Sequence, residues 1–324
     1  MLSYIIRRCL IAIPTIIGVM LFLFLLFFQV SSPESIARNV LGEKANDESI
    51  KTWVEAKGYD KPRYLNTEDD SEGLLTDTLF FNYMKDMATF DFGKSDTDEQ
   101  PIWIKLKMGV VPSLFVTVPI LIVSLIISVF ISMLSAMFRK TYIDSSVVFA
   151  CVVAMSIVYF LYIIAGQFLF AKVIKWFPVS GWSDNSIWYF LALPILIGII
   201  ANVGESTRFY RTIMIHEINS DYIRTARAKG LGDMSILVRH LLRNAMLPIL
   251  TRVIMLLPYM FTGSLLLESF FSIPGLGRLM VDSIVNNDFS TLKAGVYLSA
   301  ILYIIANIIS DISYTIADPR VRLK

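Results

Sequence analysis

Long uncharged runs dominate the pattern of hydrophobic and polar positions along this chain. A helix needs about 20 apolar residues to cross a hydrocarbon core of about 30 Å. Six runs have about this length: 9–30, 110–138, 147–171, 187–203, 245–267 and 294–316. The first four carry no Asp, Glu, Lys or Arg, and only Arg252 and Asp311 interrupt the last two. The pattern predicts an all-α integral membrane protein with six transmembrane helices.

The polar segments between these runs divide the chain into three parts. Residues 1–30 form an N-terminal segment and the first transmembrane helix, residues 31–109 a long loop domain, and residues 110–324 a core with five transmembrane helices. The core includes a second long loop, residues 204–244. Segments of this length are more than connectors, and we expect each to have its own structure.

The first long loop is predicted to be partly helical. Apolar residues spaced for one face indicate a helix over 47–57, with Gly58 as its stop signal, and a second helix over about 74–88. The acidic residues 68–72 between them are typical of a solvated loop.

The sequence at 88–95 ends in Gly-Lys-Ser, but it lacks the first glycine of a phosphate-binding loop. The chain therefore shows no ATP-binding motif of its own.

Composition supports a membrane protein, and the distribution of charge predicts its orientation. The chain is 55% hydrophobic and has a net charge of only +2, which gives no indication of nucleic acid binding. If both termini are cytoplasmic, the inner segments hold 14 basic and 6 acidic residues, and the outer segments hold 14 and 20. This asymmetry follows the positive-inside rule. The two cysteines are too few for a disulfide framework, and nothing indicates a metal site.

The loop 204–244 contains the most informative pattern. Ser220 or Asp221 can cap a short helix that continues to Lys229, and Gly230 can supply a left-handed stop. Its basic residues offer hydrogen-bond donors, and its two alanines allow a partner to approach closely. A basic loop is also typical of a simple topology determinant that contacts anionic lipid.

The order of residues in this loop favours a partner. The sequence Y-I-R-T-A-R-A-K-G-L at 222–231, followed by Pro248, resembles the cytoplasmic loop of ABC importer permeases of the dipeptide and oligopeptide subfamily. The resemblance extends to F-D-F-G-K-S at 90–95, F-P-V-S-G-W at 177–182 and S-L-L-L-E-S-F-F-S-I-P-G-L-G-R-L at 264–279, and it continues to D-P-R-V-R at 318–322. The sequence A-M-S-I-V-Y-F-L at 154–161 departs from the family's pattern, which leaves the cargo open.

This resemblance implies an ABC type I importer permease fold in the bacterial inner membrane. The chain would form a pore with a second, homologous permease and transport peptides delivered by an extracytoplasmic substrate-binding protein. ATP and Mg²⁺ would be bound by two separate ATPase subunits, so the chain itself is expected to be neither an enzyme nor a cofactor-binding protein. The residues that would contact the ATPase are Asp221, Tyr222, Ile223, Arg224, Thr225, Ala226, Arg227, Ala228, Lys229 and Gly230.

Two further features suggest roles in the membrane. Arg252 and Asp311 are charges at matching depths in different spans, and since an unpaired charge in a bilayer is costly, we expect them to form a pair. Pro274, Gly275 and Gly277 lie between the last two spans, and with the resemblance they suggest a re-entrant segment near an outer gate.

Alternative functions remain at this stage. Members of the same family that import nickel, glutathione or a peptide antibiotic would show the same features. An ion-driven secondary transporter would be expected to show an internal repeat, and none is apparent. A membrane scaffold without a pore is the third class.

Overall fold

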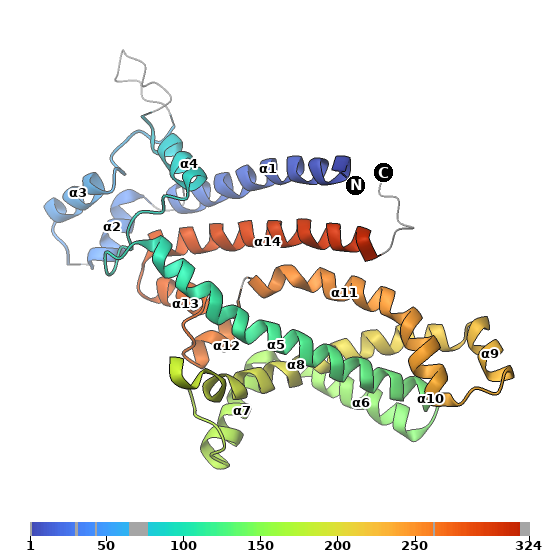
Figure 1. Ribbon diagram of the computed structural model, residues 1–324. Helices are drawn as coiled ribbons and strands as arrows, with labels where there is room; N and C mark the ends of the chain where they lie inside the picture. Colours follow the sequence, from blue (N-terminus) through green and yellow to red (C-terminus); the bar gives the residue numbers. More distant parts are fainter. Residues whose placement is uncertain (1, 30–31, 43, 65–76, 262, 318–324) are drawn as a thin grey trace.

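The computed structural model describes residues 2–29, 32–42, 44–64, 77–261 and 263–317. Within these ranges regular structure is helical, apart from an isolated β-bridge between Lys94 and Pro101. Elongated helices form a bundle, with the short helix α9 at one end and the helices α2 to α4 at the other (Figure 1). We refer to these as the α9 end and the α3 end. The acidic residues 68–72 lie outside the described residues.

The first and last long helices pack side by side. Helix α1 (Leu2–Phe24) continues as a π-helical turn over Leu25–Gln29 and lies against α14 (Phe289–Ala317) (Figure 1). The two run antiparallel, because the ring of Phe27 packs against Phe289 at one end, and Arg8 forms an ion pair with Asp311 near the other.

Helices α5 (Ile102–Met137) and α8 (Ile187–Ile218) share the most extensive contact among the described helices. The buried hydroxyl of Ser132 on α5 donates a hydrogen bond to the backbone oxygen of Thr207 on α8 at 2.9 Å. Gly198 on α8 leaves room for Ile120, since a Cβ there would overlap the isoleucine side chain. Small residues and hydroxyls are the usual means by which helices approach closely in a membrane, where lipid is as apolar as the side chains.

The third predicted span is broken. Helix α6 (Tyr142–Ser156) and helix α7 (Tyr159–Gly166, extended as a π-helix over Gln167–Val173) meet at 93°. Ile157 is extended at the break, and the hydroxyl of Tyr162 donates a hydrogen bond to the oxygen of Ala154, a carbonyl of the last α6 turn. The bend falls within the sequence that departs from the family's pattern, and it contains no proline.

Short helices occupy both ends of the molecule. At the α3 end lie α2 (Pro33–Leu41), α3 (Asp47–Ala56) and α4 (Leu79–Thr89). Helices α3 and α4 confirm the two predicted helices over the described residues, although α4 begins at Leu79 rather than at about 74, and α2 was not predicted. At the α9 end lie α9 (Asp221–Ala228) and α10 (Asp233–Ser235). A π-helix over Ile236–Leu242 then leads into α11 (Arg243–Phe261). Two more short helices, α12 (Leu265–Phe270) and α13 (Leu276–Val285), precede α14.

The described residues contain five helices that are long and apolar enough to cross a membrane, and the bent pair α6–α7 gives up to six spans. The prediction of six spans is confirmed in this sense, but several boundaries differ. Helix α8 continues to Ile218, well beyond the expected end at 203, because a helix does not stop where its apolar residues stop. The fifth span ends near Met260 rather than at 267, since Gly263 adopts a positive φ of 71°.

Candidate functional site

Helix α9 stands at one end of the molecule (Figure 1), and its buried residues lie on one face. Ser220 precedes it in an extended conformation, and Gly230 ends it with a positive φ of 76°, as predicted. Ile223 and Ala226, three residues apart on one face, are buried in a cluster with Tyr210 and Leu237 of the same chain. Ala226 is therefore not available to a partner, and the expectation that it allows close approach is wrong.

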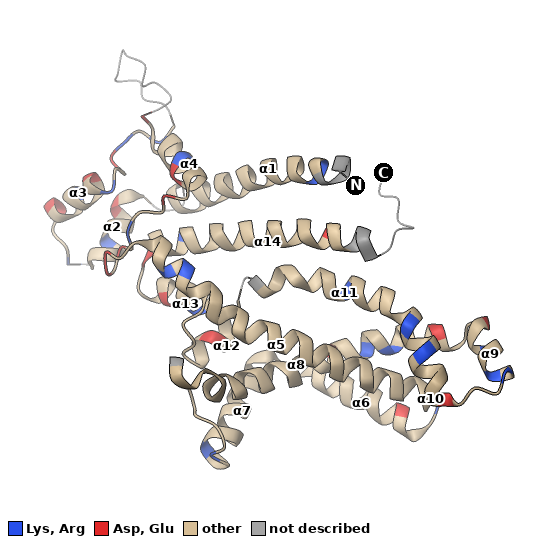
Figure 2. Ribbon diagram, in the orientation of Figure 1, with Lys and Arg blue, Asp and Glu red and all other residues tan. Residues whose placement is uncertain are grey.

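The opposite face of α9 is open. The exposed residues of the predicted coupling segment are Asp221, Arg224, Thr225, Arg227, Ala228, Lys229 and Gly230. Lys and Arg residues on α9 and the neighbouring helix ends gather at this end of the molecule (Figure 2). The short helix thus combines an anchoring face with a charged, exposed face that carries one small residue, Ala228.

The two charges within the predicted spans do not pair with each other. Arg252 on α11 contacts Glu205 on α8 at 2.8 Å, and its guanidinium lies 5.2 Å from the centre of the Phe209 ring. Asp311 contacts Arg8 at 3.1 Å. The expected Arg252–Asp311 pair is corrected for a physical reason: Glu205 belongs to the continued helix α8, so a carboxylate lies beside Arg252 that the sequence pattern had placed in a loop.

A second ion pair near the α9 end was not anticipated. Arg211 on α8 forms two hydrogen bonds with the carboxylate of Asp144 on α6, at 2.7 and 2.8 Å. The hydroxyl of Ser135 on α5 also donates to Asp144, so three helices meet at one nearly buried carboxylate. The sequence pattern had placed Asp144 in the loop just before the third predicted span, whereas the structure places it in the first turn of α6.

The segment between α11 and α14 is organised by the fully buried carboxylate of Glu268. Its Oε1 accepts a hydrogen bond from the backbone N–H of Ser264, and its Oε2 accepts one from the N–H of Gly277 at 2.7 Å, at the start of α13. A Cβ atom at Gly263 or Gly275 would overlap this carboxylate. Burial raises the pKa of Glu268, and the backbone donors oppose that shift.

The glycines of the predicted gate motif therefore have a structural role. Gly275 and Gly277 leave the space into which Glu268 inserts, and Ser113 on α5 also reaches this point and accepts a hydrogen bond from the N–H of Leu276 at 2.9 Å. The sequence pattern identified the glycines but gave no indication of the carboxylate they surround. The segment is folded back against α5 and linked to it.

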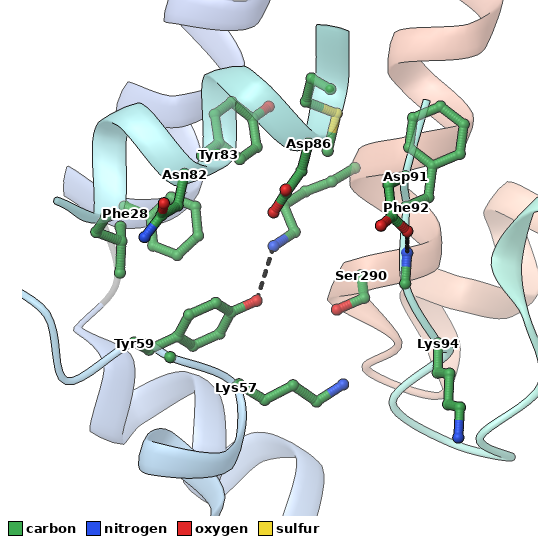
Figure 3. A pocket seen from close by; sticks show the side chains of 15 residues that line it. Phe28, Lys57, Tyr59, Asn82, Tyr83, Asp86, Asp91, Phe92, Lys94 and Ser290 are labelled. Carbon is green, nitrogen blue, oxygen red and sulfur yellow. Dashed lines mark hydrogen bonds between the residues drawn. The ribbon is translucent and has the colours of Figure 1, made fainter. Parts of the chain in front are cut away.

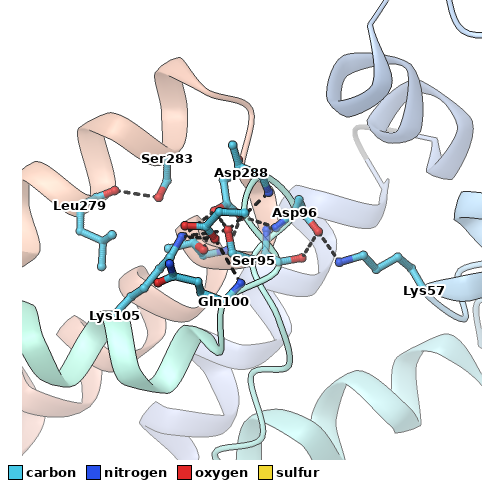
Figure 4. A network of polar contacts seen from close by, with 12 residues as sticks. Lys57, Ser95, Asp96, Gln100, Lys105, Leu279, Ser283 and Asp288 are labelled. Atoms are coloured by element: carbon cyan, nitrogen blue, oxygen red, sulfur yellow. Dashed lines mark hydrogen bonds and ion pairs between the residues drawn. The ribbon is translucent and has the colours of Figure 1, made fainter.

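At the α3 end, two segments far apart in the chain meet in a polar network (Figure 4). The hydroxyl of Ser95 and the backbone N–H of Asp96 donate hydrogen bonds to the carboxylate of Asp288. The Asp96 carboxylate accepts hydrogen bonds from the N–H and the hydroxyl of Ser290 at the start of α14, and it contacts Lys57. Lys105 on α5 donates to Ser95 at 2.9 Å. This network links the first long loop to both α5 and α14.

A cavity of about 250 Å³ lies beside this network, between the first long loop and the start of α14 (Figure 3). The ammonium of Lys293, a residue only 6% exposed, donates to the Tyr59 hydroxyl at 2.9 Å and lies 4.8 Å from the centre of the Phe28 ring. Asp86 also faces the cavity, and burial together with the nearby Asp91 raises its pKa. The cavity thus presents both signs of charge and joins the loop domain to α14.

These features define a class of protein. Five helices of membrane length, or up to six spans with the bent pair, together with a short exposed helix at one end and a folded loop domain at the other, describe a polytopic helical membrane protein. Residues 103–323 match the family described as binding-protein-dependent transport system inner membrane component. The chain belongs to this family.

Curated relatives match along the whole chain. It is 30% identical over 329 residues to the oligopeptide transport system permease protein AppB of Bacillus subtilis (strain 168), covering 99% of both chains. It is 30% identical to the glutathione transport system permease protein GsiC of Shigella flexneri, covering all of both chains. It is 28% identical to the dipeptide transport system permease protein DppB of Alkalihalophilus pseudofirmus, covering 99% of this chain and all of the relative.

Proposed function

We propose that this chain is the permease subunit of an ABC importer for short peptides, and that it forms the translocation pore with a second, homologous permease. The observation that supports this most directly is the full-length similarity to permeases named for oligopeptide and dipeptide transport. Glutathione is a second candidate cargo, because a glutathione permease is equally similar. Glutathione is itself a tripeptide, so both cargoes belong to one chemical class.

The α9 end would face the cytoplasm, with both chain termini, because the basic residues gather there (Figure 2). Two ATPase subunits would bind the exposed face of α9, which carries Arg224, Arg227 and Lys229 as donors for carboxylates and carbonyls. ATP and Mg²⁺ would be held by those subunits. Because Ile223 and Ala226 fix α9 to the body of the chain, a movement of the ATPases would be transmitted to α8 and α11.

At the opposite end, a substrate-binding protein would deliver the cargo to the outer surface. The polar network of Ser95, Asp96 and Asp288 would hold the loop domain in place for that contact. The segment with Pro274, Gly275 and Gly277 would form part of the outer gate, because it folds back against α5 next to the loop that ends α11.

Reconstitution tests this proposal. Proteoliposomes that contain this chain, its second permease and two ATPases should accumulate a labelled dipeptide or glutathione only when ATP is inside and the binding protein is outside. Absence of uptake of either cargo in a complex with active ATPase would contradict the peptide assignment.

A pair of variants tests the coupling surface. Ala228→Trp places a large side chain on the exposed face of α9 and should detach the ATPases and abolish uptake. Ala88→Trp changes an exposed alanine near the end of a short helix at the α3 end, and it should leave ATPase binding unchanged. Normal ATPase binding in Ala228→Trp would contradict the role of α9.

A further inference from the structure

One exposed face of α8 is polar although it lies within a candidate membrane span. Asn202, Glu205 and Phe209 are exposed and spaced so that they share one face of the helix. The side chain of Glu205 is 62% exposed. Glu205 follows Ile187, the first residue of the span, by 18 positions, which places it roughly 27 Å along the helix. This position is near the end of a core about 30 Å thick, and the exposed carboxylate contacts Arg252 on α11 at 2.8 Å.

Helix α11 continues this polar face. Arg252, Met255 and Tyr259 recur at helical spacing, and the last two are each 60% exposed. Arg252 forms the ion pair with Glu205 and packs over the ring of Phe209, so the exposed faces of the two helices form one continuous surface.

A cavity of about 300 Å³ opens beside the same surface. Asn202 and Tyr259 belong to both, and Ser206, Thr117 and Ser124 supply further hydroxyl groups to the cavity lining. None of the residues that line it is Asp, Glu, Lys or Arg. Its lining combines neutral hydrogen-bonding groups and tyrosine rings with aliphatic side chains such as those of Ile120, Leu125 and Leu256.

An apolar stripe on α5 provides the contrast. Ile122, Ile126 and Phe130 are 50, 62 and 56% exposed and share one face, so they are as open as the polar face but suited to lipid. A charged side chain costs about 2.5–3.5 kcal/mol on insertion scales at the centre of a membrane span, and Glu205 lies closer to the end of its span. Two exposed stripes of similar accessibility and opposite chemistry therefore face different surroundings.

We propose that Asn202, Glu205, Arg252 and Tyr259 line the water-filled passage along which the cargo crosses the membrane. The passage would present neutral donors and acceptors to backbone amides, which all peptides share, and a single ion pair with both signs of charge to their charged ends. This inference rests on the proposed function for the identity of the cargo, but the position of the face depends only on the structure.

Cysteine labelling in the assembled complex tests the position of the face. The native Cys9 and Cys151 are first replaced by alanine, and Asn202→Cys and Tyr259→Cys are then made singly in a background that retains uptake. Ile126→Cys on the apolar stripe is the matched control. Membrane vesicles of each orientation are treated with a charged maleimide that does not cross the bilayer.

The polar-face cysteines should react at least tenfold faster than Ile126→Cys in the assembled complex. Reaction in the purified chain but protection in the complex would show that this face is buried against the second permease, and it would overturn the inference. Equal reactivity at Asn202→Cys and Ile126→Cys would also overturn it. Because labelling needs no cargo, it separates failure of this inference from failure of peptide uptake, which the proteoliposome assay reports.

Discussion

The space around Glu268 gives the sharpest stability prediction. In Gly275→Ala, the new Cβ would lie 2.5 Å from Glu268 Cδ and 2.6 Å from Ser113 Oγ, and it would overlap Oε2 more severely. Real Cβ atoms essentially never approach other atoms within 3.0 Å. The carboxylate must therefore move, and it would lose its hydrogen bond with the N–H of Gly277.

The cost follows from two effects. Overpacking of this kind costs about 1–3 kcal/mol, and loss of a hydrogen bond to a charged group costs about 1.5–3 kcal/mol. We expect Gly275→Ala to lower the free energy of unfolding by roughly 2.5–6 kcal/mol. Gly18→Ala is the control, because no atom lies within 4 Å of a Cβ at that helical position. It should change stability by less than about 1 kcal/mol, in the stabilising direction.

Denaturant unfolding of the purified chain in detergent, followed by tryptophan fluorescence, measures these differences. The double variant Glu268→Ala/Gly275→Ala should lose less unfolding free energy than the sum of the losses in the two single variants, because both changes remove the same contact. If Gly275→Ala is as stable as Gly18→Ala, or if the two single costs add within about 0.5 kcal/mol, the glycine does not serve to accommodate the carboxylate.

Three further predictions concern the other contacts. Asp144→Ala leaves Arg211 without its carboxylate partner and should lower the free energy of unfolding by about 3–5 kcal/mol in the same assay. The double variant Asp144→Ala/Arg211→Ala should recover part of this loss, and a double variant less stable than Asp144→Ala would contradict the pairing. Ser132→Ala removes one hydrogen bond between α5 and α8 and should lower the free energy of unfolding by about 0.5–1.5 kcal/mol. Ser132→Leu should lower it by about 1–3 kcal/mol through overpacking, and a Ser132→Leu variant more stable than Ser132→Ala would refute the close contact. Burial raises the pKa of Asp288, but hydrogen bonds from Ser95 and Thr291 outweigh this effect and hold the pKa below the ordinary value of 3.8. The ionised Asp288 carboxylate therefore stabilises the fold above pH 3.8, and this stabilisation is lost as the pH falls through the lowered pKa. The thermal midpoint of the wild type should then approach that of Asp288→Asn as the pH falls, and a constant difference would show that Asp288 does not act through its charge.

Much of the architecture could be predicted from the sequence because it depends on local signals. Uncharged runs of membrane length located the spans, and Gly58 and Gly230 marked helix ends that the structure confirms with positive φ values. The short helix α9 was predicted within one residue at each end. The family could also be predicted, since its motifs are contiguous in the sequence and residues 103–323 match its description.

The partners of buried charges could not be predicted in this way. Arg252 was assigned to Asp311 from matching depths alone, but depth does not determine which face of a helix a residue occupies. The role of Ala226 was also misjudged, because its small size suits a contact within the chain as well as one with a partner.

By itself, the sequence determined that this chain is helical, lies in a membrane and belongs to a family of transport components, because apolar run length, turn residues and contiguous motifs act over short stretches of chain. Only the tertiary structure decided which side chains meet. It placed Glu268 among three glycines, joined Ser95 to Asp288 and set Glu205 beside Arg252, since these contacts depend on how helices distant in sequence rotate and pack against each other. The physical reason is that a polar group inside a membrane protein must find a partner, and packing determines which partner is within reach.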